Sequence, residues 1–317
     1  MEPQPALVEL IAEELRQPVA AGAQVLAESI RRRHGRAVQA ILFYGSCLRT
    51  GDDRNGVLDF YVLVDDYRHF YTRRIWALLN ALLPPNVFYI EASGESGPVR
   101  AKYAVVSLAG LARYTSARCF HPYFWARFAQ PCALVYTRNA AAAEAVANAL
   151  STAVVTFIRQ GVALVPQHFR IADLWKRVLR ESYHSEVRAE RGETPARLYD
   201  AAPLRYERVT QAALAALPYP TSIDTVSGAP MVVVRMPALA RWGACHSWRL
   251  RRAEGKLLSL LRILKGAFTF KGGVEYVLWK IERHSGVRAD PSWRSRRPRL
   301  LALGSVFWRL YRKRAFR

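Results

Sequence analysis

The chain has 317 residues, 51% of them hydrophobic, so it is long enough for two domains, or for one domain with a long extension, and can form a sizeable core. Its 47 Lys and Arg against 25 Asp and Glu give a net charge of +22, which attracts nucleic acid, anionic membranes or nucleotide phosphates. The alternative explanation of this excess is a GC-rich genome that encodes Arg in place of Lys. The four cysteines form no CxxC pair and have no metal-site spacing with His. The N-terminus is unlike a secretory signal, and no run reaches the roughly 20 apolar residues of a spanning helix. We therefore expect a cytoplasmic protein.

The first 140 residues alternate between helical and strand patterns. Apolar residues recur every three or four positions over 5–34, which predicts a helix ending at RRRHG. A second helix is predicted over 68–83, where two prolines stop it. Short apolar runs predict strands at 37–44, 56–64, 87–92, 99–108 and 131–136. This alternation predicts an α/β nucleotide-handling domain over residues 1–140.

The pattern from residue 141 onward is mostly helical, and we predict a second domain over 141–284. Its first apolar run is interrupted by Glu144 and Asn148, so it predicts a buried helix over 140–160 rather than a membrane span. The stretch 217–237 reads as a loop followed by an apolar run that could form a strand pair. Further helices are predicted at 170–181, 195–216, 250–266 and 273–284.

The last segment, 285–317, has a different composition. From Arg283 onward, ten Arg and one Lys stand against a single acid, Asp290, with aromatic residues interspersed. The stretch RPRLLALGSVFWRLYRKRAFR has the pattern of a helix with an apolar stripe and basic ends. Such a segment fits an anionic membrane surface. An RNA-binding tail and a helix packed on the body are the alternatives.

The clearest candidate site lies between the first two predicted strands. Gly45 and Ser46 form a small turn at a strand end, where backbone N–H groups and a hydroxyl can cradle a triphosphate. Asp59 follows thirteen residues later, inside an apolar strand, where aspartate is rare and a buried carboxylate needs a partner. Mg²⁺ carried by a nucleotide would be that partner, and a salt bridge to a core Arg is the alternative.

Strand alternation places Tyr61 and Asp65 on the same face as Asp59. Polymerase-β-type nucleotidyltransferases, which this strand, Gly-Ser turn and strand resemble, carry Asp-x-Asp on the second strand. Tyr61 therefore occupies the position of the second carboxylate. We expect Asp65, at the strand end, to reach a metal through water, and Asp66 to cap the next helix.

Five segments in the same order resemble one family, the peripheral CDP-diacylglycerol synthases of the mitochondrial matrix side, which form the translocator assembly and maintenance family. FYGS and LDFYVLVDD form the first segment, and ILKGAFTFKGGVEYVLWKIER resembles the family's Lys-Gly-x-x-Thr-x-Gly stretch. The resemblance extends from about residue 38 to 284. In between, RAKYAVVSL, YFWARFAQPCALVY and LRESYHSEVRAERGETPARL resemble three further family segments and align Lys102, Tyr103, Arg127, Ser182, Tyr183, Glu186 and Arg188 with family positions. The chain departs from the family pattern at Ala126, Gln130 and Glu186.

The resemblance implies transfer of a cytidylyl group from CTP to phosphatidate, which yields CDP-diacylglycerol and pyrophosphate and requires Mg²⁺. The implied fold is a polymerase-β-like nucleotidyltransferase domain, a mostly helical, winged-helix-like domain and a basic amphipathic C-terminal segment. The implied partners are CTP, phosphatidate and an anionic membrane, with the protein peripheral on the inner face of the membrane and no nucleic acid expected.

Each candidate residue then has an expected role. The metal would be bound by Asp59 and Asp65, and the nucleotide by Gly45, Ser46, Lys102 and Tyr103. The substrate would be bound by Ser182, Tyr183, Glu186 and Arg188. The catalytic residues would be Asp59, Lys102 and Arg127.

Tyr61 fits this reaction, by our hypothesis, because the second pKa of a phosphate monoester is about 6 and the nucleophile therefore arrives already charged. A decayed, inactive site is the alternative explanation. Two other functions remain open at this stage: a nucleotidyltransferase acting on RNA, and a catalytically inactive, membrane-bound nucleotide sensor or scaffold.

Overall fold

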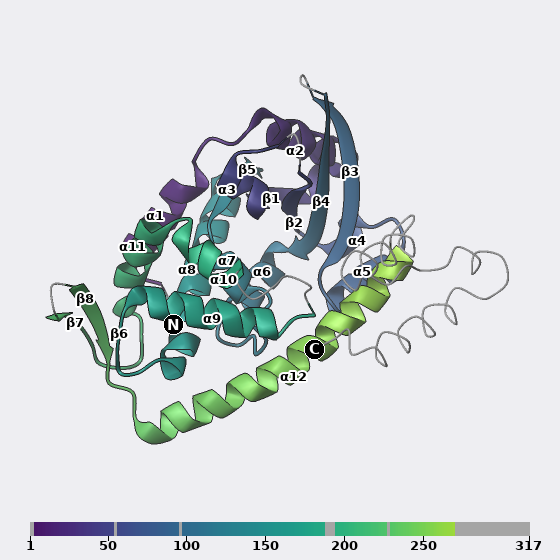
Figure 1. Cartoon of the computed structure of the whole chain (residues 1–317). Coiled ribbons are helices and arrows are strands. Elements are labelled where there is room, and N and C mark those ends of the chain that lie inside the picture. The colour runs from purple at the N-terminus through teal and green to yellow at the C-terminus, as the bar shows by residue number, and fades with distance from the viewer. Residues whose placement is uncertain (1–2, 54–55, 95–96, 188–193, 227–228, 270–317) are drawn as a thin grey trace.

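A mixed five-stranded sheet forms the N-terminal part of the protein (Figure 1). The computed structural model describes residues 3–53, 56–94, 97–187, 194–226 and 229–269. The strand order is β3-β4-β2-β1-β5, with β2 and β4 parallel and the other neighbours antiparallel. The strands are β1 (Val38–Tyr44), β2 (Leu58–Val64), β3 (Asn86–Gly94), β4 (Gly97–Ser107) and β5 (Cys132–Thr137). The prediction of an α/β domain with five strands is confirmed.

Helices cover both faces of this sheet. The strands β1 and β2 alternate, so Leu42 and Leu63 join one buried cluster while Phe43 and Phe60 join the other. The first cluster is covered by α1 (Pro5–Leu15), α6 (Leu108–Thr115), α7 (Trp125–Phe128) and α8 (Ala140–Gly161). The second is covered by α2 (Ala21–His34), α4 (Tyr67–Phe70) and α5 (Arg74–Leu82).

Two predicted helices are each divided in the structure. The helix predicted over 5–34 is two helices, α1 and α2, because Pro18 has no N–H to donate and disfavours helical geometry at Gln17. The helix predicted over 68–83 is likewise α4 and α5. Asp66 caps the first of these, since its side chain accepts a hydrogen bond from the backbone N–H of Arg68 at 2.7 Å, as predicted.

A helical region follows the sheet. The hairpin expected within 217–237 is present, and with β6 it forms a three-stranded sheet of order β6-β8-β7. The helix predicted over 195–216 is interrupted just before Pro203. The elements of this region are η2 (Val162–Leu164), β6 (His168–Phe169), α9 (Ile171–His184), α10 (Thr194–Asp200), α11 (Pro203–Leu214), β7 (Thr221–Val226), β8 (Ala229–Val234) and α12 (Ala238–Thr269). Two short helices, η1 (Gly35–Ala37) and α3 (Ser46–Thr50), flank β1 in the N-terminal part.

The long apolar helix α8 is a core helix, as its interrupted apolar pattern predicts. Within the described residues, the segment Ala140–Leu164 alone has the length and hydropathy of a membrane span, but 67% of its apolar window is buried inside the protein. Val146, Leu150 and Val154 are almost fully buried in the cluster that also contains Leu42 of the sheet. That cluster continues into α9 and α11, so the sheet and the helical region share a hydrophobic core.

The C-terminal predictions meet the structure only in part. The helix predicted over 250–266 lies within the much longer α12, which begins at Ala238. The helix predicted over 273–284 and the basic segment 285–317 lie outside the described residues.

Candidate functional site

Three neighbouring strands bring a carboxylate and a lysine side by side on one face of the sheet. In the antiparallel pair of β1 and β2, Tyr44 lies opposite Asp59, and in the parallel pair of β2 and β4, Asp59 lies opposite Lys102. Residues paired in this way project from the same face of a sheet with Cβ atoms about 5 Å apart. Tyr44, Asp59 and Lys102 therefore form a row on the face covered by α1, α6, α7 and α8.

The Gly45–Ser46 turn packs directly on this carboxylate. Gly45 has a φ of +92°, in the region that favours glycine, and a Cβ at this position would lie 3.0 Å from Oδ2 of Asp59. Ser46 follows as the first residue of α3. The backbone of the turn can thus approach a ligand at Asp59 more closely than any larger residue would allow.

Tyr61 lies two residues further along β2, beneath the site. Its side chain is fully buried, and its ring packs against Tyr44 at 5.1 Å and Phe128 at 4.8 Å between centroids. Among the described residues the hydroxyl makes no hydrogen bond of ordinary geometry, and Tyr123 and Arg127 are its polar neighbours. Burial, followed by the nearby Tyr123, raises the pKa of Tyr61 well above its usual range, so the phenol stays protonated. Tyr61 thus supplies no negative charge at the position where the sequence resemblance leads us to expect a second carboxylate.

Arg127, on α7, lies over the row of sheet residues. Its Nη1 donates to the hydroxyl of Tyr44 at 3.3 Å, and its Nη2 lies 3.7 Å from the carboxylate of Glu186. The guanidinium also stacks 4.8 Å from the ring centroid of Tyr123. Although burial alone would lower the pKa of Arg127, the surrounding tyrosines and Glu186 raise it, so the cation persists. The structure therefore joins Arg127 and Glu186, two candidates nearly 60 positions apart, to the site of Asp59.

A second arginine, Arg262 on α12, was not predicted from the sequence. Its guanidinium lies 4.1 Å from the ring centroid of Tyr123, the ring that Arg127 also contacts, and its Nε donates to the carbonyl of Pro84 at 2.8 Å. Burial and, to a smaller extent, the positive charge of Arg262 lower the pKa of His121 to about 4, so the imidazole is neutral at pH 7. Arg262 stands in a helical stretch with no feature that marks it, and only the docking of α12 reveals it.

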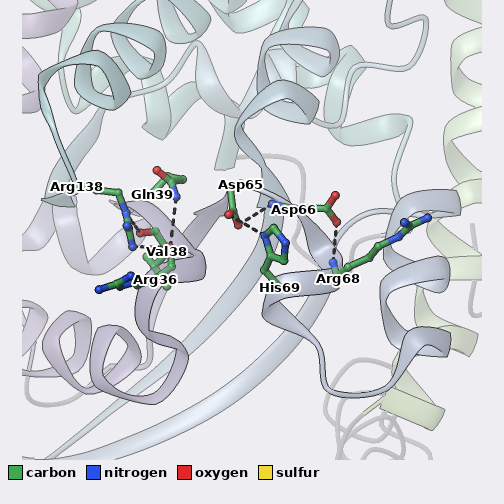
Figure 2. Close-up of polar contacts among 8 residues, drawn as sticks. All are labelled: Arg36, Val38, Gln39, Asp65, Asp66, Arg68, His69 and Arg138. Atoms are coloured by element: carbon green, nitrogen blue, oxygen red, sulfur yellow. Dashed lines mark hydrogen bonds and ion pairs between the residues drawn. The ribbon is translucent and has the colours of Figure 1, made fainter.

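Asp65 does not share a site with Asp59. Asp59 is the second residue of β2 and Asp65 follows its last residue, so the two are six residues apart, which is about 20 Å at 3.3 Å per residue. Figure 2 shows Asp65 instead bonded to Nδ1 of His69 at 2.9 Å and to the backbone N–H of Asp66. The structure therefore does not bring Asp65 next to Asp59, and a role of Asp65 in metal binding stays a prediction.

Three further candidates lie away from the site or have local partners. Tyr103 projects from the opposite face of the sheet, where its hydroxyl lies 3.2 Å from Nε2 of His34. Ser182 is buried and donates to the carbonyl of Leu179 in its own helix. Tyr183 packs at the edge of the core, and Arg188 lies outside the described residues.

The donor set at Asp59 fits a magnesium ion only if it arrives with a nucleotide. The described ranges contain no group of three or more His, Cys, Asp or Glu residues placed to hold a metal. Mg²⁺, however, keeps several waters and is commonly held by one or two carboxylates together with substrate phosphates. Asp59, beside the Gly45–Ser46 turn, matches that smaller requirement.

Comparison with known proteins leaves the family open. No protein-family model matches the chain, and no curated protein matches it either.

Proposed function

We propose that this protein is a Mg²⁺-dependent nucleotidyltransferase that transfers a cytidylyl group from CTP to phosphatidate at an anionic membrane surface. The observation that carries the proposal is the packing of the Gly45–Ser46 turn on Asp59, with Lys102 in the neighbouring strand and Arg127 above. A glycine turn, one carboxylate and clustered cations form a site for a metal-bound triphosphate and a second anion.

The fold supports the same proposal. The order β1, Gly-Ser turn, α3 and β2 is compatible with the polymerase-β-like nucleotidyltransferase domain that we propose. In the helical region, the β7–β8 hairpin follows α11 and pairs with β6, an arrangement that suits a winged-helix-like domain.

The chain's own residues would bind and orient two anions. The backbone of Gly45 and the hydroxyl of Ser46 would contact the triphosphate, and Asp59 would hold the metal that accompanies it. Bound there, Mg²⁺ supplies neutralisation of the charge that develops on the pyrophosphate leaving group. Lys102, Arg127 and the newly identified Arg262 would offset the repulsion between triphosphate and lipid phosphate.

The reaction needs no general base. An oxygen of phosphatidate attacks the α-phosphorus of CTP, a new P–O bond forms, and the bond from the α-phosphorus to the bridging oxygen breaks to release pyrophosphate. Because a phosphate monoester has a second pKa near 6, the attacking group is largely dianionic at pH 7. This explains why a protonated, buried Tyr61 is compatible with the site, whereas a sugar hydroxyl would call for stronger activation.

The test is cytidylyl transfer by the purified chain, with Mg²⁺, labelled CTP and phosphatidate vesicles. We expect a labelled lipid, a loss of at least about 100-fold in Asp59→Asn, and nearly unchanged activity in Asp65→Asn, a matched charge change at the far end of β2. Equal losses in both variants would contradict the assignment of Asp59.

Two other results would redirect the proposal. Label incorporated into RNA rather than lipid would identify an RNA nucleotidyltransferase, and CTP binding without any product would identify a nucleotide sensor.

A further inference from the structure

The long helix α12 packs on the protein along only one side. On that side Trp248 is 1% exposed and donates from Nε1 to the carbonyl of Gln160, and Arg251 bonds to the carbonyl of Phe120. Gly255 approaches α9 so closely that a Cβ would lie 2.3 Å from the carbonyl oxygen of Ser185. Figure 1 shows the helix running along the outside of the molecule from the β7–β8 hairpin to α5.

The opposite side of α12 carries an apolar stripe that faces solvent. The positions of these apolar residues along α12 confine them to about 100° of the helix circumference, which makes them one continuous face. The members are Leu239, Trp242, Leu250, Leu257 and Leu261, with exposed fractions of 81%, 61%, 64%, 57% and 41%. Large apolar side chains in one row are unusual on a free surface and indicate an interaction site.

Basic residues flank this stripe. Arg249 and Lys256 are exposed beside it, and α12 as a whole carries seven Lys and Arg but a single acid, Glu254. At its C-terminal end, Nζ of Lys265 bonds to the carbonyls of Leu83 and Pro85, which fixes α12 against the end of α5. The helix α5 adds exposed Ile75, Leu78 and Leu82, next to exposed Arg73 and Arg74.

We propose that the outer face of α12, together with the exposed side of α5, docks on an anionic lipid bilayer. Apolar side chains would enter the interface while Arg249 and Lys256 meet the headgroups. A second copy of the chain fits this face less well, because the same positive flank would confront itself. The docking surface named here consists of described residues and is distinct from the basic segment 285–317.

The position of α12 links this surface to the candidate site. Its inner side places Arg262 over Tyr123, while its outer side carries Leu257 and Leu261. A bilayer bound to the outer side would lie one helix diameter, about 10 Å, from Arg262 on the inner side. The inference that docking delivers a lipid phosphate rests on the proposed function, whereas docking itself does not.

The experiment is vesicle flotation of the full chain without nucleotide. The probes are vesicles of phosphatidylcholine alone and vesicles that also contain phosphatidylglycerol, which is anionic but is not the proposed substrate. We expect binding only to the anionic vesicles, reduced at least about tenfold by the double variant Leu250→Glu/Leu257→Glu. The matched control is Leu204→Glu on α11, at a leucine 73% exposed, which should bind as the unmodified chain does.

Each outcome decides a separate point. No flotation of the unmodified chain, or equal flotation of the double variant, overturns the docking surface. If light scattering shows that the unmodified chain is a dimer and the double variant a monomer, with vesicle binding intact, the face is assigned to self-association instead. The double variant should still transfer a cytidylyl group to detergent-dispersed phosphatidate. If the unmodified chain does not catalyse this transfer, the proposed function is overturned, while the docking result remains valid.

Discussion

Tyr61 shows how a single buried residue limits the chemistry of the site. The sequence predicts it in the second-carboxylate position, and the structure adds that aromatic rings from β1 and α7 enclose it. A carboxylate placed there would lose its hydration among those rings, and Arg127, the cation beside this position, already faces Glu186. The tyrosine therefore belongs to a packed aromatic core under the site, and the metal would depend on Asp59.

Substitutions at Tyr61 test this account. Tyr61→Phe removes a buried hydroxyl that makes no hydrogen bond of ordinary geometry within the described part of the chain, so the free energy of unfolding should stay the same or rise by up to about 1 kcal/mol, with transfer activity kept. Tyr61→Asp should cost about 3 kcal/mol or more and should not increase transfer. Urea unfolding and the labelled-CTP assay measure both effects. A large gain in transfer by Tyr61→Asp would contradict the argument that the nucleophile arrives charged.

His34 gives the fold a dependence on pH. Its ring stacks on Phe70 at 4.0 Å between centroids and bonds to Tyr103, and burial, followed by Arg33, lowers its pKa to about 4. Since the unfolded chain binds this proton near pH 6.5, the stabilisation is complete above that pH. It is lost progressively as the pH falls from about 6.5 toward 4.

The variant His34→Phe keeps the stacking and removes the titrating group. We expect the free energy of unfolding to fall less steeply with acid than in the unmodified chain, measured by urea unfolding between pH 7 and pH 4.5. His69 is the contrasting position, because its hydrogen bond to the exposed Asp65 raises its pKa. His69→Phe should therefore change the slope in the opposite sense, and parallel curves for all three proteins would refute the role of His34.

At the scale of elements, α12 is where local pattern and tertiary packing differ most. The sequence predicts a helix only over 250–266, whereas the helix begins at Ala238. Its N-terminal half alternates small residues with Trp and Arg, and its position is fixed by contacts with α8, α9 and the loop at Phe120. Glycine at position 255 is required by the close approach to Ser185, which a local helix pattern does not reveal.

Two glycines of α12 provide a matched test of this docking. Gly255→Ala forces the helix away from Ser185 and should lower the free energy of unfolding by about 1–3 kcal/mol. Gly243→Ala meets nothing within 4 Å and should raise it by up to about 1 kcal/mol through helix propensity. Urea unfolding of both variants measures the difference. If both variants were stabilised equally, α12 would not be held against α9 as described.

At the scale of the whole molecule, a nearly buried ion pair ties the N-terminal helix to the helical region. Oε2 of Glu14 lies 2.6 Å from Nε of Arg205, and its Oε1 accepts from the backbone N–H of Cys132 at 3.2 Å. Arg205 also donates to the carbonyl of Ala129. Residues 191 positions apart thus join α1, α11 and the start of β5, over a hydrophobic cluster that spans both parts of the chain.

Removing one partner of this pair should weaken the entire fold. Glu14→Ala leaves Arg205 buried without its counter-charge, and we expect the free energy of unfolding to fall by about 3 kcal/mol. Glu28→Ala, which removes an exposed carboxylate paired with Arg31 at 2.6 Å, should have a much smaller and salt-sensitive effect. Urea unfolding at low and high salt separates the two, and equal losses would show that the Glu14 pair does not couple the two regions.

The local features of this protein follow from the order of its residues alone. Strand alternation fixed which residues share a face, so Asp59 and Tyr61 were correctly placed together, and the five strands and most helices lie where apolar spacing predicts them. The same alternation separates the adjacent Lys102 and Tyr103 onto opposite faces, and it is the family resemblance that grouped them. These features follow from backbone geometry over a few residues.

Only the tertiary structure decided which distant residues meet. The parallel register of β2 and β4 placed Lys102 beside Asp59, and the packing of α7 and α12 brought Arg127 and Arg262 over the sheet. It also separated Asp65 from Asp59 by the length of a strand. Such contacts depend on strand order and on how helices close over a shared core, and they are set by long-range packing that no local pattern of residues specifies.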